Sequence, residues 1–385
     1  MKRFLLPLML AVSLLLTGCG WMDGSYLSVT PHQQQRQNSQ TEVISASNYS
    51  ELIQAMKMII EAGTEIAAIN VADYPATALD RGVEMASEHV MTYDPVAAYA
   101  VKSIQCELGV SMGQPAVAMN VEYLHGRTEI QQIRRVRDSK EAEKIVAEAL
   151  EAFEPGIVLL VENYDDRDYT QYVQDYAQEN PQTVMETPQV TEAVCGSGNG
   201  RVIELVFTYQ NSRDTLRRMQ TQVQPVFDSA VLYVSGDDAD RQKYAQLYAF
   251  LMERFDYKQE TSITPAYSLL RHGVGDSRAF ATVYAAMCRG AGLECLVVTG
   301  THAGEPWTWN LVLDNGQYYH VDLLRCSESG GFQTLSNAQM EEYVWDYSMY
   351  PASTGSGEIS TEPMQAETQS VEDSASEAEE GASQK

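Results

Sequence analysis

The stretch HGVGDSRAFATVYAAMCRGAGLECLVVTG, His272 to Gly300, predicts a glycine-containing turn, an amphipathic helix and a buried strand. Asp276 is a good N-cap for a helix that begins at Ser277. Apolar side chains then recur with helical spacing, at Phe280, Val283, Tyr284 and Met287. At the first turn, the helix dipole helps a cysteine to ionise. A serine hydroxyl is a far weaker acid, so Ser277 needs a general base to act as a nucleophile.

The stretch WTWNLVLDNGQYYHVDLL, residues 307–324, predicts a β-hairpin. Its two apolar-rich strands flank Asn315-Gly316, a typical type I′ turn. That turn predicts three cross-strand pairs, which are Asp314 with Gln317, Leu311 with His320, and Trp309 with Asp322. Strand alternation then predicts one shared face for Trp307, Trp309, His320 and Asp322.

This order of elements resembles the transglutaminase-like superfamily, which has a papain-related cysteine fold. The segment Arg241 to Lys258 resembles the helix that precedes the nucleophile, and NLVLDNGQYYHVD, residues 310–322, resembles the final hairpin. The resemblance covers residues 236–348. It implies an α+β fold for this part of the chain, with a nucleophile-type helix packed on an antiparallel sheet.

Active members of that superfamily use a Cys, a His and an Asp. Carried over by position, the Cys falls on Ser277, the His on Trp307 and the Asp on Asp322. Only the aspartate matches. Without an imidazole, nothing at these positions can accept the proton of the nucleophile, and Asp322 has no base to orient. The resemblance therefore implies a pseudoenzyme that binds or scaffolds, with an old cleft walled by Trp307 and Trp309.

The alternative is an active hydrolase, peptidase or transferase that uses Ser277 with a displaced base. His320 shares the predicted face of Asp322, and His302 lies in the loop before the hairpin. Either imidazole is a candidate base. We favour structural or surface roles for both, because proton transfer needs a geometry that displacement rarely keeps.

The N-terminus predicts export. Lys2 and Arg3 precede the apolar run FLLPLMLAVSLLL, and Leu-Thr-Gly-Cys follows at residues 16–19. The last four residues resemble a bacterial lipobox, which implies a signal peptide over 1–18 and lipidation of Cys19. We therefore expect a lipid anchor in the cell membrane, on its extracytoplasmic face. An uncleaved anchor, or secretion with an incidental cysteine, is the alternative.

Charge and motif spacing exclude several kinds of site. The chain has 385 residues and a net charge of −27, which argues against nucleic-acid binding. Its histidines show no zinc-ligand spacing, so we expect no metal. The segment GSGNG, Gly196 to Gly200, stands between two predicted strands and does not open a helix, so it predicts a hairpin turn rather than a phosphate-binding loop. We expect no cofactor, and as partners the membrane through Cys19 and a peptide, glycan or envelope protein.

The remaining chain predicts a duplicated α/β region between two polar ends. The order helix, strand, helix, strand, strand occurs twice, which favours two layers of helices on sheets. Whether the two copies share one sheet is left open. The expected divisions are a tether over 19–44, copies at about 45–135 and 136–220, the transglutaminase-like domain over 221–350, and a disordered acidic tail over 351–385.

Overall fold

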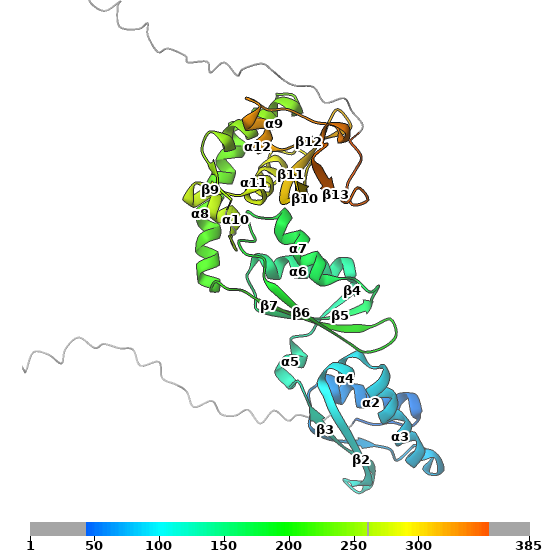
Figure 1. Cartoon of the computed structure of the whole chain (residues 1–385). Coiled ribbons are helices and arrows are strands. Elements are labelled where there is room, and N and C mark those ends of the chain that lie inside the picture. Colours follow the sequence, from blue (N-terminus) through cyan, green and yellow to red (C-terminus); the bar gives the residue numbers. More distant parts are fainter. Residues whose placement is uncertain (1–43, 260–261, 354–385) are drawn as a thin grey trace, which may run out of the picture.

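The computed structural model describes residues 44–259 and 262–353. The expected signal peptide, Cys19, the tether up to residue 43 and the tail from residue 354 lie outside these ranges. The described chain forms three units in a row, with the N-terminal unit at the lower end of the view (Figure 1). In these two ranges no helix has the length and apolar character needed to cross a membrane.

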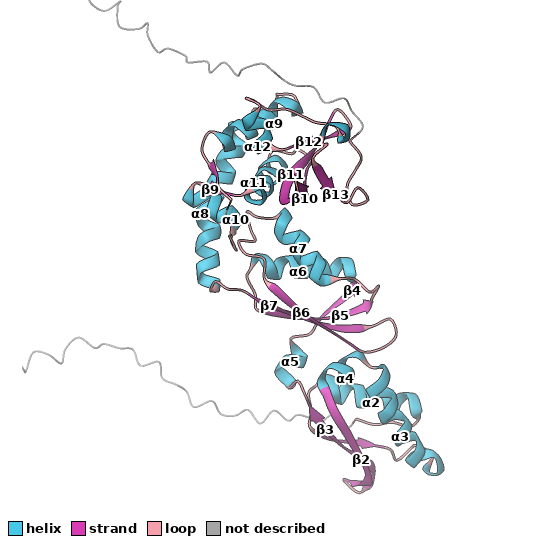
Figure 2. Cartoon of the chain, viewed as in Figure 1, coloured by secondary structure: helices cyan, strands magenta, loops and turns pink. Residues whose placement is uncertain are grey.

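The N-terminal unit is a three-stranded antiparallel sheet with helices on one face (Figure 2). Its strand order is β1-β3-β2, and the buried Leu52, Ile69 and Val117 lie in the core between helices and sheet. Asn48 caps the first helix by accepting the N–H of Glu51. The elements are α2 (Tyr49–Glu61), β1 (Ile66–Asn70), α3 (Ala76–Tyr93), α4 (Pro95–Ala100), β2 (Val101–Ser111), β3 (Gln114–Tyr123) and α5 (Arg127–Gln131).

The middle unit has its own four-stranded sheet, in the order β4-β5-β7-β6. The sheets of the two α/β units are therefore separate, which answers the question that the sequence left open. Residues 196–200 join the antiparallel strands β6 and β7, so GSGNG is the expected hairpin turn. The elements are β4 (Arg134–Asp138), α6 (Ser139–Glu151), β5 (Gly156–Asn163), α7 (Tyr169–Glu179), β6 (Gln189–Cys195) and β7 (Arg201–Thr208).

A long helix, α8 (Arg213–Tyr233), leads into the C-terminal unit. The expected domain boundary between residues 220 and 221 falls inside this helix. Leu216 of α8 lies in one core cluster with Phe153 and Met185 of the middle unit and with the helices of the C-terminal unit. A boundary before Arg213 keeps the helix within one unit. It still divides the core that the middle and C-terminal units share.

The C-terminal unit packs helices against a sheet in the order β12-β11-β10-β13. The helix α11 is almost wholly buried against this sheet, which confirms the expected α+β fold with a nucleophile-type helix on an antiparallel sheet. The elements are α9 (Asp240–Met252), β8 (Asp256–Tyr257), α10 (Pro265–His272), β9 (Val274–Gly275), α11 (Ser277–Gly290), β10 (Cys295–His302), β11 (Glu305–Asp314), β12 (Gln317–Val321), α12 (Leu323–Glu328), the 3₁₀ turn η1 (Asn337–Gln339) and β13 (Tyr343–Trp345).

The hairpin of β11 and β12 has the register set by its turn. Asn315 and Gly316 have φ of 51° and 76°, as a type I′ turn requires. Leu311 pairs with His320 and Asp314 with Gln317, as expected. The expected pair of Trp309 with Asp322 is wrong, because β12 ends at Val321 and Asp322 caps α12.

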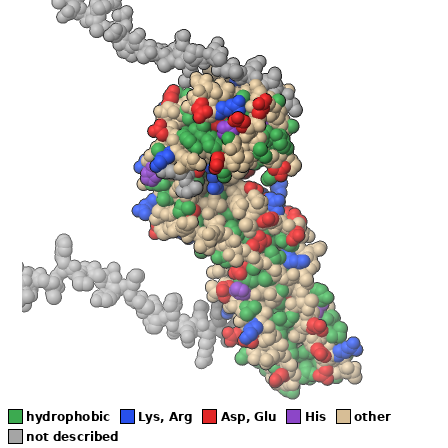
Figure 3. All heavy atoms as spheres, viewed as in Figure 1, with side chains coloured by type: hydrophobic (Ala, Val, Ile, Leu, Met, Phe, Trp, Pro, Cys, Tyr) green, Lys and Arg blue, Asp and Glu red, His purple; other side chains and the backbone are tan. Residues whose placement is uncertain are grey.

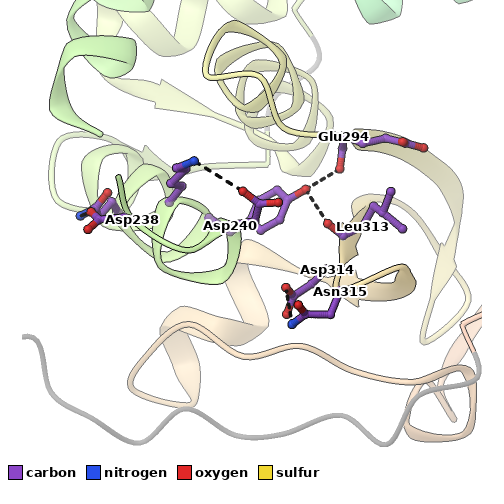
Figure 4. A network of polar contacts seen from close by, with 9 residues as sticks. Asp238, Asp240, Glu294, Leu313, Asp314 and Asn315 are labelled. Carbon is purple, nitrogen blue, oxygen red and sulfur yellow. Dashed lines mark hydrogen bonds and ion pairs between the residues drawn. The ribbon is translucent and has the colours of Figure 1, made fainter. Parts of the chain in front are cut away.

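A polar network ties α9 to the hairpin (Figure 4). The hydroxyl of Tyr244 donates to the carbonyls of Glu294, at 2.6 Å, and Leu313, at 3.2 Å. Tyr244 is buried, so these carbonyls supply the hydrogen bonds that its hydroxyl would otherwise make to water. Helix α9 is thereby fixed to the start of β10 and to the end of β11.

Candidate functional site

Ser277 is the first residue of α11 and is tied to strand β11. The carboxylate of Asp276 accepts the N–H of Ala279 at 2.8 Å, so the predicted N-cap is confirmed. Ser277 is only 8% exposed, and its Oγ accepts the N–H of Thr308 at 3.3 Å. One turn later Asn310 donates to the carbonyl of Ala281 at 2.9 Å. Thr308 and Asn310 therefore mark the face of β11 that meets the helix.

Trp307 and Asp322 are joined directly. The indole Nε1 of Trp307 donates to Oδ2 of Asp322 at 2.7 Å. The indole thus lies beside Asp322, at the place that the resemblance assigns to a histidine. Asp322 orients an indole ring and not a base, because an indole nitrogen only donates and cannot accept the proton of a nucleophile.

Asp322 is 2% exposed, and both of its carboxylate oxygens accept hydrogen bonds from other parts of the C-terminal unit. Besides the indole, its Oδ2 accepts the hydroxyl of Tyr343 at 2.7 Å. Its Oδ1 accepts the backbone N–H groups of Leu324 and Arg325 at 3.0 and 3.3 Å and so caps α12. Burial, followed by the charge of Asp322, raises the pKa of Tyr343, which keeps this phenol a donor. The carboxylate therefore holds together β11, α12 and β13.

His320 does not lie near Ser277. His320 pairs with Leu311 and therefore shares the face of Trp309, opposite to the face of Thr308 and Asn310 that meets α11. Its Nδ1 accepts the indole N–H of Trp309 at 2.9 Å, and its Nε2 lies 2.8 Å from Oδ1 of Asn337. Since both ring nitrogens are engaged and burial lowers the pKa of His320, this imidazole is a neutral structural group. The proposed displaced base at His320 is out of position.

His302 lies close to Trp307 but has other partners. Its ring stacks on Tyr343 with centroids 4.2 Å apart, and its Nε2 lies 3.4 Å from the carboxylate of Glu342. The ring of Trp307 meets it edge-on at 5.5 Å. His302 and Trp307 line the same cavity, whereas Ser277 does not line it. The structure thus brings His302, Trp307 and Asp322 together at the cavity, whereas Ser277 lies beside this group, bonded to the backbone N–H of Thr308, and does not line the cavity.

The cavity has a volume of about 670 Å³. Trp307 forms part of its wall, but Trp309 is 1% exposed and does not, which corrects the expected cleft of two tryptophans. Trp309 is covered because Tyr343 and Trp345 of β13 pack edge-on against it. The lining residues are His302, Trp307, Asp322, Leu324, Arg325, Glu328, Gln333, Leu335, Ala338, Gln339, Glu341 and Glu342.

The lining of the cavity gives it an acidic rim and an aromatic wall. Glu328, Glu341 and Glu342 outnumber Arg325 at its rim, so it favours positive groups on a ligand. The ring of Trp307 offers an apolar or sugar-stacking surface. Within residues 44–259 and 262–353, no three His, Cys, Asp or Glu side chains are placed to hold a metal ion.

Tyr343 is one of two site residues that sequence reasoning missed. It lies 21 residues after Asp322 and reaches the carboxylate through β13, which pairs with β10. A three-residue strand after a loop leaves no periodic signal in the sequence. Tyr257, whose ring lies 5.8 Å from that of Trp307, was missed for the same reason, because β8 has only two residues.

Residues 229–323 match the family model of the transglutaminase-like superfamily. This match begins and ends somewhat earlier than the expected 236–348, and it supports the resemblance for this part of the chain. No curated protein matches the sequence.

Three solved structures are similar to the chain at low identity. A structure titled as a TGase is 9% identical, with a TM-score of 0.25, over 55% of this chain and 62% of that one. A protein described as a cysteine protease from Cytophaga hutchinsonii is 13% identical, with a TM-score of 0.24, over 38% and 65%. One described as a protease from Parabacteroides distasonis is 10% identical, with a TM-score of 0.22, over 66% and 39%. The chain thus spans less than two thirds of each structure's own length, and these TM-scores carry no further argument.

Proposed function

We propose that the transglutaminase-like domain of this chain does not catalyse and instead binds a peptide or glycan-linked peptide at the bacterial cell surface. In this proposal the chain is held at the membrane by a lipid on Cys19. The observation that carries the proposal is the hydrogen bond from the indole of Trp307 to Asp322 at 2.7 Å. It places a group that cannot accept a proton where the superfamily's mechanism needs a base.

The surroundings of Ser277 support the loss of catalysis. Its hydroxyl is buried and accepts a backbone N–H, and no imidazole hydrogen-bonds to it within the described residues. Both histidines considered as a displaced base have other partners. His320 bonds Trp309 on the opposite face of the sheet, and His302 contacts Tyr343 and Glu342. A serine without a base is a poor nucleophile at neutral pH.

The cavity supports binding. Its volume of about 670 Å³ lies within the usual range for ligand sites. The partly exposed ring of Trp307, which lines the cavity, suits a sugar ring or an apolar side chain, and the acidic rim suits the amino groups of a peptide. Muropeptides, which are sugar-linked peptides of the bacterial wall, combine these features and are the ligand class to test first.

The catalytic half of the proposal is tested with a fluorophosphonate, which labels activated serines. We expect Ser277 to stay unmodified in the full chain, as judged by peptide mass mapping beside an active serine hydrolase. We also expect Ser277→Cys combined with Trp307→His to gain reactivity toward iodoacetamide, since this pair restores a thiol and an imidazole beside Asp322. Labelling of wild-type Ser277 that disappears in His302→Ala would instead establish the active-enzyme alternative.

The binding half is tested by titrating muropeptides against the intrinsic fluorescence of the full chain. We expect quenching that is lost in Trp307→Phe and kept in Trp345→Phe, because Trp345 is buried and does not line the cavity. Equal quenching in both variants would place the ligand elsewhere and contradict the proposed site.

A further inference from the structure

A second groove lies in the N-terminal unit, between helix α3 and strand β2. Its volume is about 620 Å³, comparable to that of the cavity at Trp307. It belongs to a different unit and shares no residue with that cavity. The residues that line it are Asp80, Val83, Glu84, Ser87, Glu88, Met91, Ile104, Cys106 and Leu108.

One wall of this groove is an open sheet edge. In the order β1-β3-β2, strand β2 pairs with β3 alone, over Val101–Ser111. Along such an edge, alternate residues direct their backbone N–H and C=O groups away from the sheet. An unpaired edge of this length is a template for one more strand unless the protein covers it.

The floor of the groove is an apolar stripe that continues past the helix. Alternation puts the side chains of Ile104, Cys106, Leu108 and Val110 on one face of β2. Their exposure rises along the strand, to 46% at Leu108 and 74% at Val110. Met112, in the turn that follows, is 92% exposed. Helix α3 thus covers only the first part of the stripe, and the rest meets solvent.

The opposite rim is acidic. Asp80, Glu84 and Glu88 stand four residues apart on one face of α3, all exposed. In the part of the chain that the structure describes, none of the three pairs with a cation, and the lining contains no Lys, Arg or His. Arg81 is the nearest cation along α3, but it does not line the groove. On the face seen in Figure 3, both acidic and basic side chains lie among hydrophobic ones over this unit.

We propose that an extended peptide of another protein binds in this groove as a fourth strand on β2. Its backbone pairs with the free edge, alternate apolar side chains enter the floor, and Lys or Arg residues between them meet Asp80, Glu84 and Glu88. This is β-strand addition, in which main-chain hydrogen bonds give affinity and side-chain contacts give specificity.

The acidic rim favours a basic peptide over two other possible occupants of the groove. The chain's own C-terminal segment, residues 354–385, is acidic and has Lys385 as its single cation, so the rim repels it. A second copy paired through β2 would bring two sets of these carboxylates together, which disfavours that dimer. A basic peptide is the partner that the rim favours.

Cys106 provides a direct readout of occupancy. Its thiol lines the groove and is partly exposed, as is that of Cys195 in the middle unit. The full chain is treated with N-ethylmaleimide, with and without a blocked octapeptide of alternating lysine and valine, and each cysteine is followed by mass mapping. We expect the peptide to slow modification of Cys106 and not of Cys195. Equal rates at Cys106 with and without the peptide would overturn the proposal.

Further peptides and variants test the charge contribution and the strand pairing separately. We expect Glu84→Lys to weaken the lysine–valine peptide about tenfold, and the matched Glu148→Lys on α6 to leave it unchanged. A peptide N-methylated at alternate residues should lose binding, because it cannot complete the ladder. If the N-methylated peptide protects Cys106 as well as the unmodified one, strand addition is contradicted. If a peptide of alternating glutamate and valine protects Cys106 equally, selection by charge is contradicted. A peptide-free dimer in sedimentation that Val110→Lys dissolves would assign the edge to a second copy and refute the proposal.

Discussion

Replacing Asp322 tests whether this carboxylate is a remnant or a structural centre. Its two oxygens accept four hydrogen bonds, from the indole of Trp307, the hydroxyl of Tyr343 and two backbone N–H groups of α12. In Asp322→Ala the helix loses its cap, which costs about 1 kcal/mol, and two buried donors lose their acceptor, at about 1 to 3 kcal/mol each. We therefore expect the C-terminal unit to lose about 3 to 7 kcal/mol of its free energy of unfolding.

Two conservative variants are expected to lose less free energy of unfolding than Asp322→Ala. In Asp322→Asn the amide oxygen can still cap α12, and the hydroxyl of Tyr343 can turn to donate or accept, but the amide N–H₂ faces the N–H of Trp307. We expect a loss of about 2 kcal/mol, from one unpaired donor. Trp307→Phe keeps most of the ring and removes one hydrogen bond, so about 1 kcal/mol is expected.

The assay is urea unfolding followed by tryptophan fluorescence. Three of the four tryptophans, at 307, 309 and 345, lie in the C-terminal unit, so the signal reports mainly on it. The expected order of stability loss is Asp322→Ala, Asp322→Asn, then Trp307→Phe. A loss below about 1 kcal/mol for Asp322→Ala would show that the network is not structural and would refute this reasoning.

Three further outcomes are expected. A fatty-acid analogue should label the protein in cells and fail to label Cys19→Ala, and an unlabelled wild type in the medium would contradict the lipid anchor. Burial lowers the pKa of His320, whose ordinary value is 6.5. The stability from its neutral form is therefore complete above pH 6.5 and is lost below it, by up to about 1.4 kcal/mol per pH unit. Urea midpoints from pH 8 to 5 should fall less steeply in His320→Gln. A fragment of residues 213–353 should unfold more cooperatively than one of 221–353, which lacks the buried Leu216; equal cooperativity would count against the boundary before Arg213.

Local signals made much of the fold predictable. The Asn315-Gly316 turn determines the hairpin register, because a two-residue loop leaves the strands one pairing. Asp276 and the spacing of apolar residues after it likewise place α11. These features depend on neighbouring residues, which the sequence lists side by side.

Features that depend on distant segments were not predictable. Trp309 is buried because β13 lies beside β10, although more than thirty residues separate it from β13. The resemblance assigns a histidine to the position of Trp307, but the bond of this indole to Asp322 depends on a side-chain rotamer that no spacing encodes. Strand β4, which pairs in parallel with β5, also went unpredicted, since RRVRD is charged and shows a single buried residue.

The indole at position 307 also bears on how the domain can be altered. It packs against two core clusters and fills more space than an imidazole could. A change of Trp307 to histidine therefore opens a void, and a change of Ser277 to cysteine without that histidine yields a thiol with no base. Neither single change supplies both a nucleophile and a base, so the two positions have to be altered together.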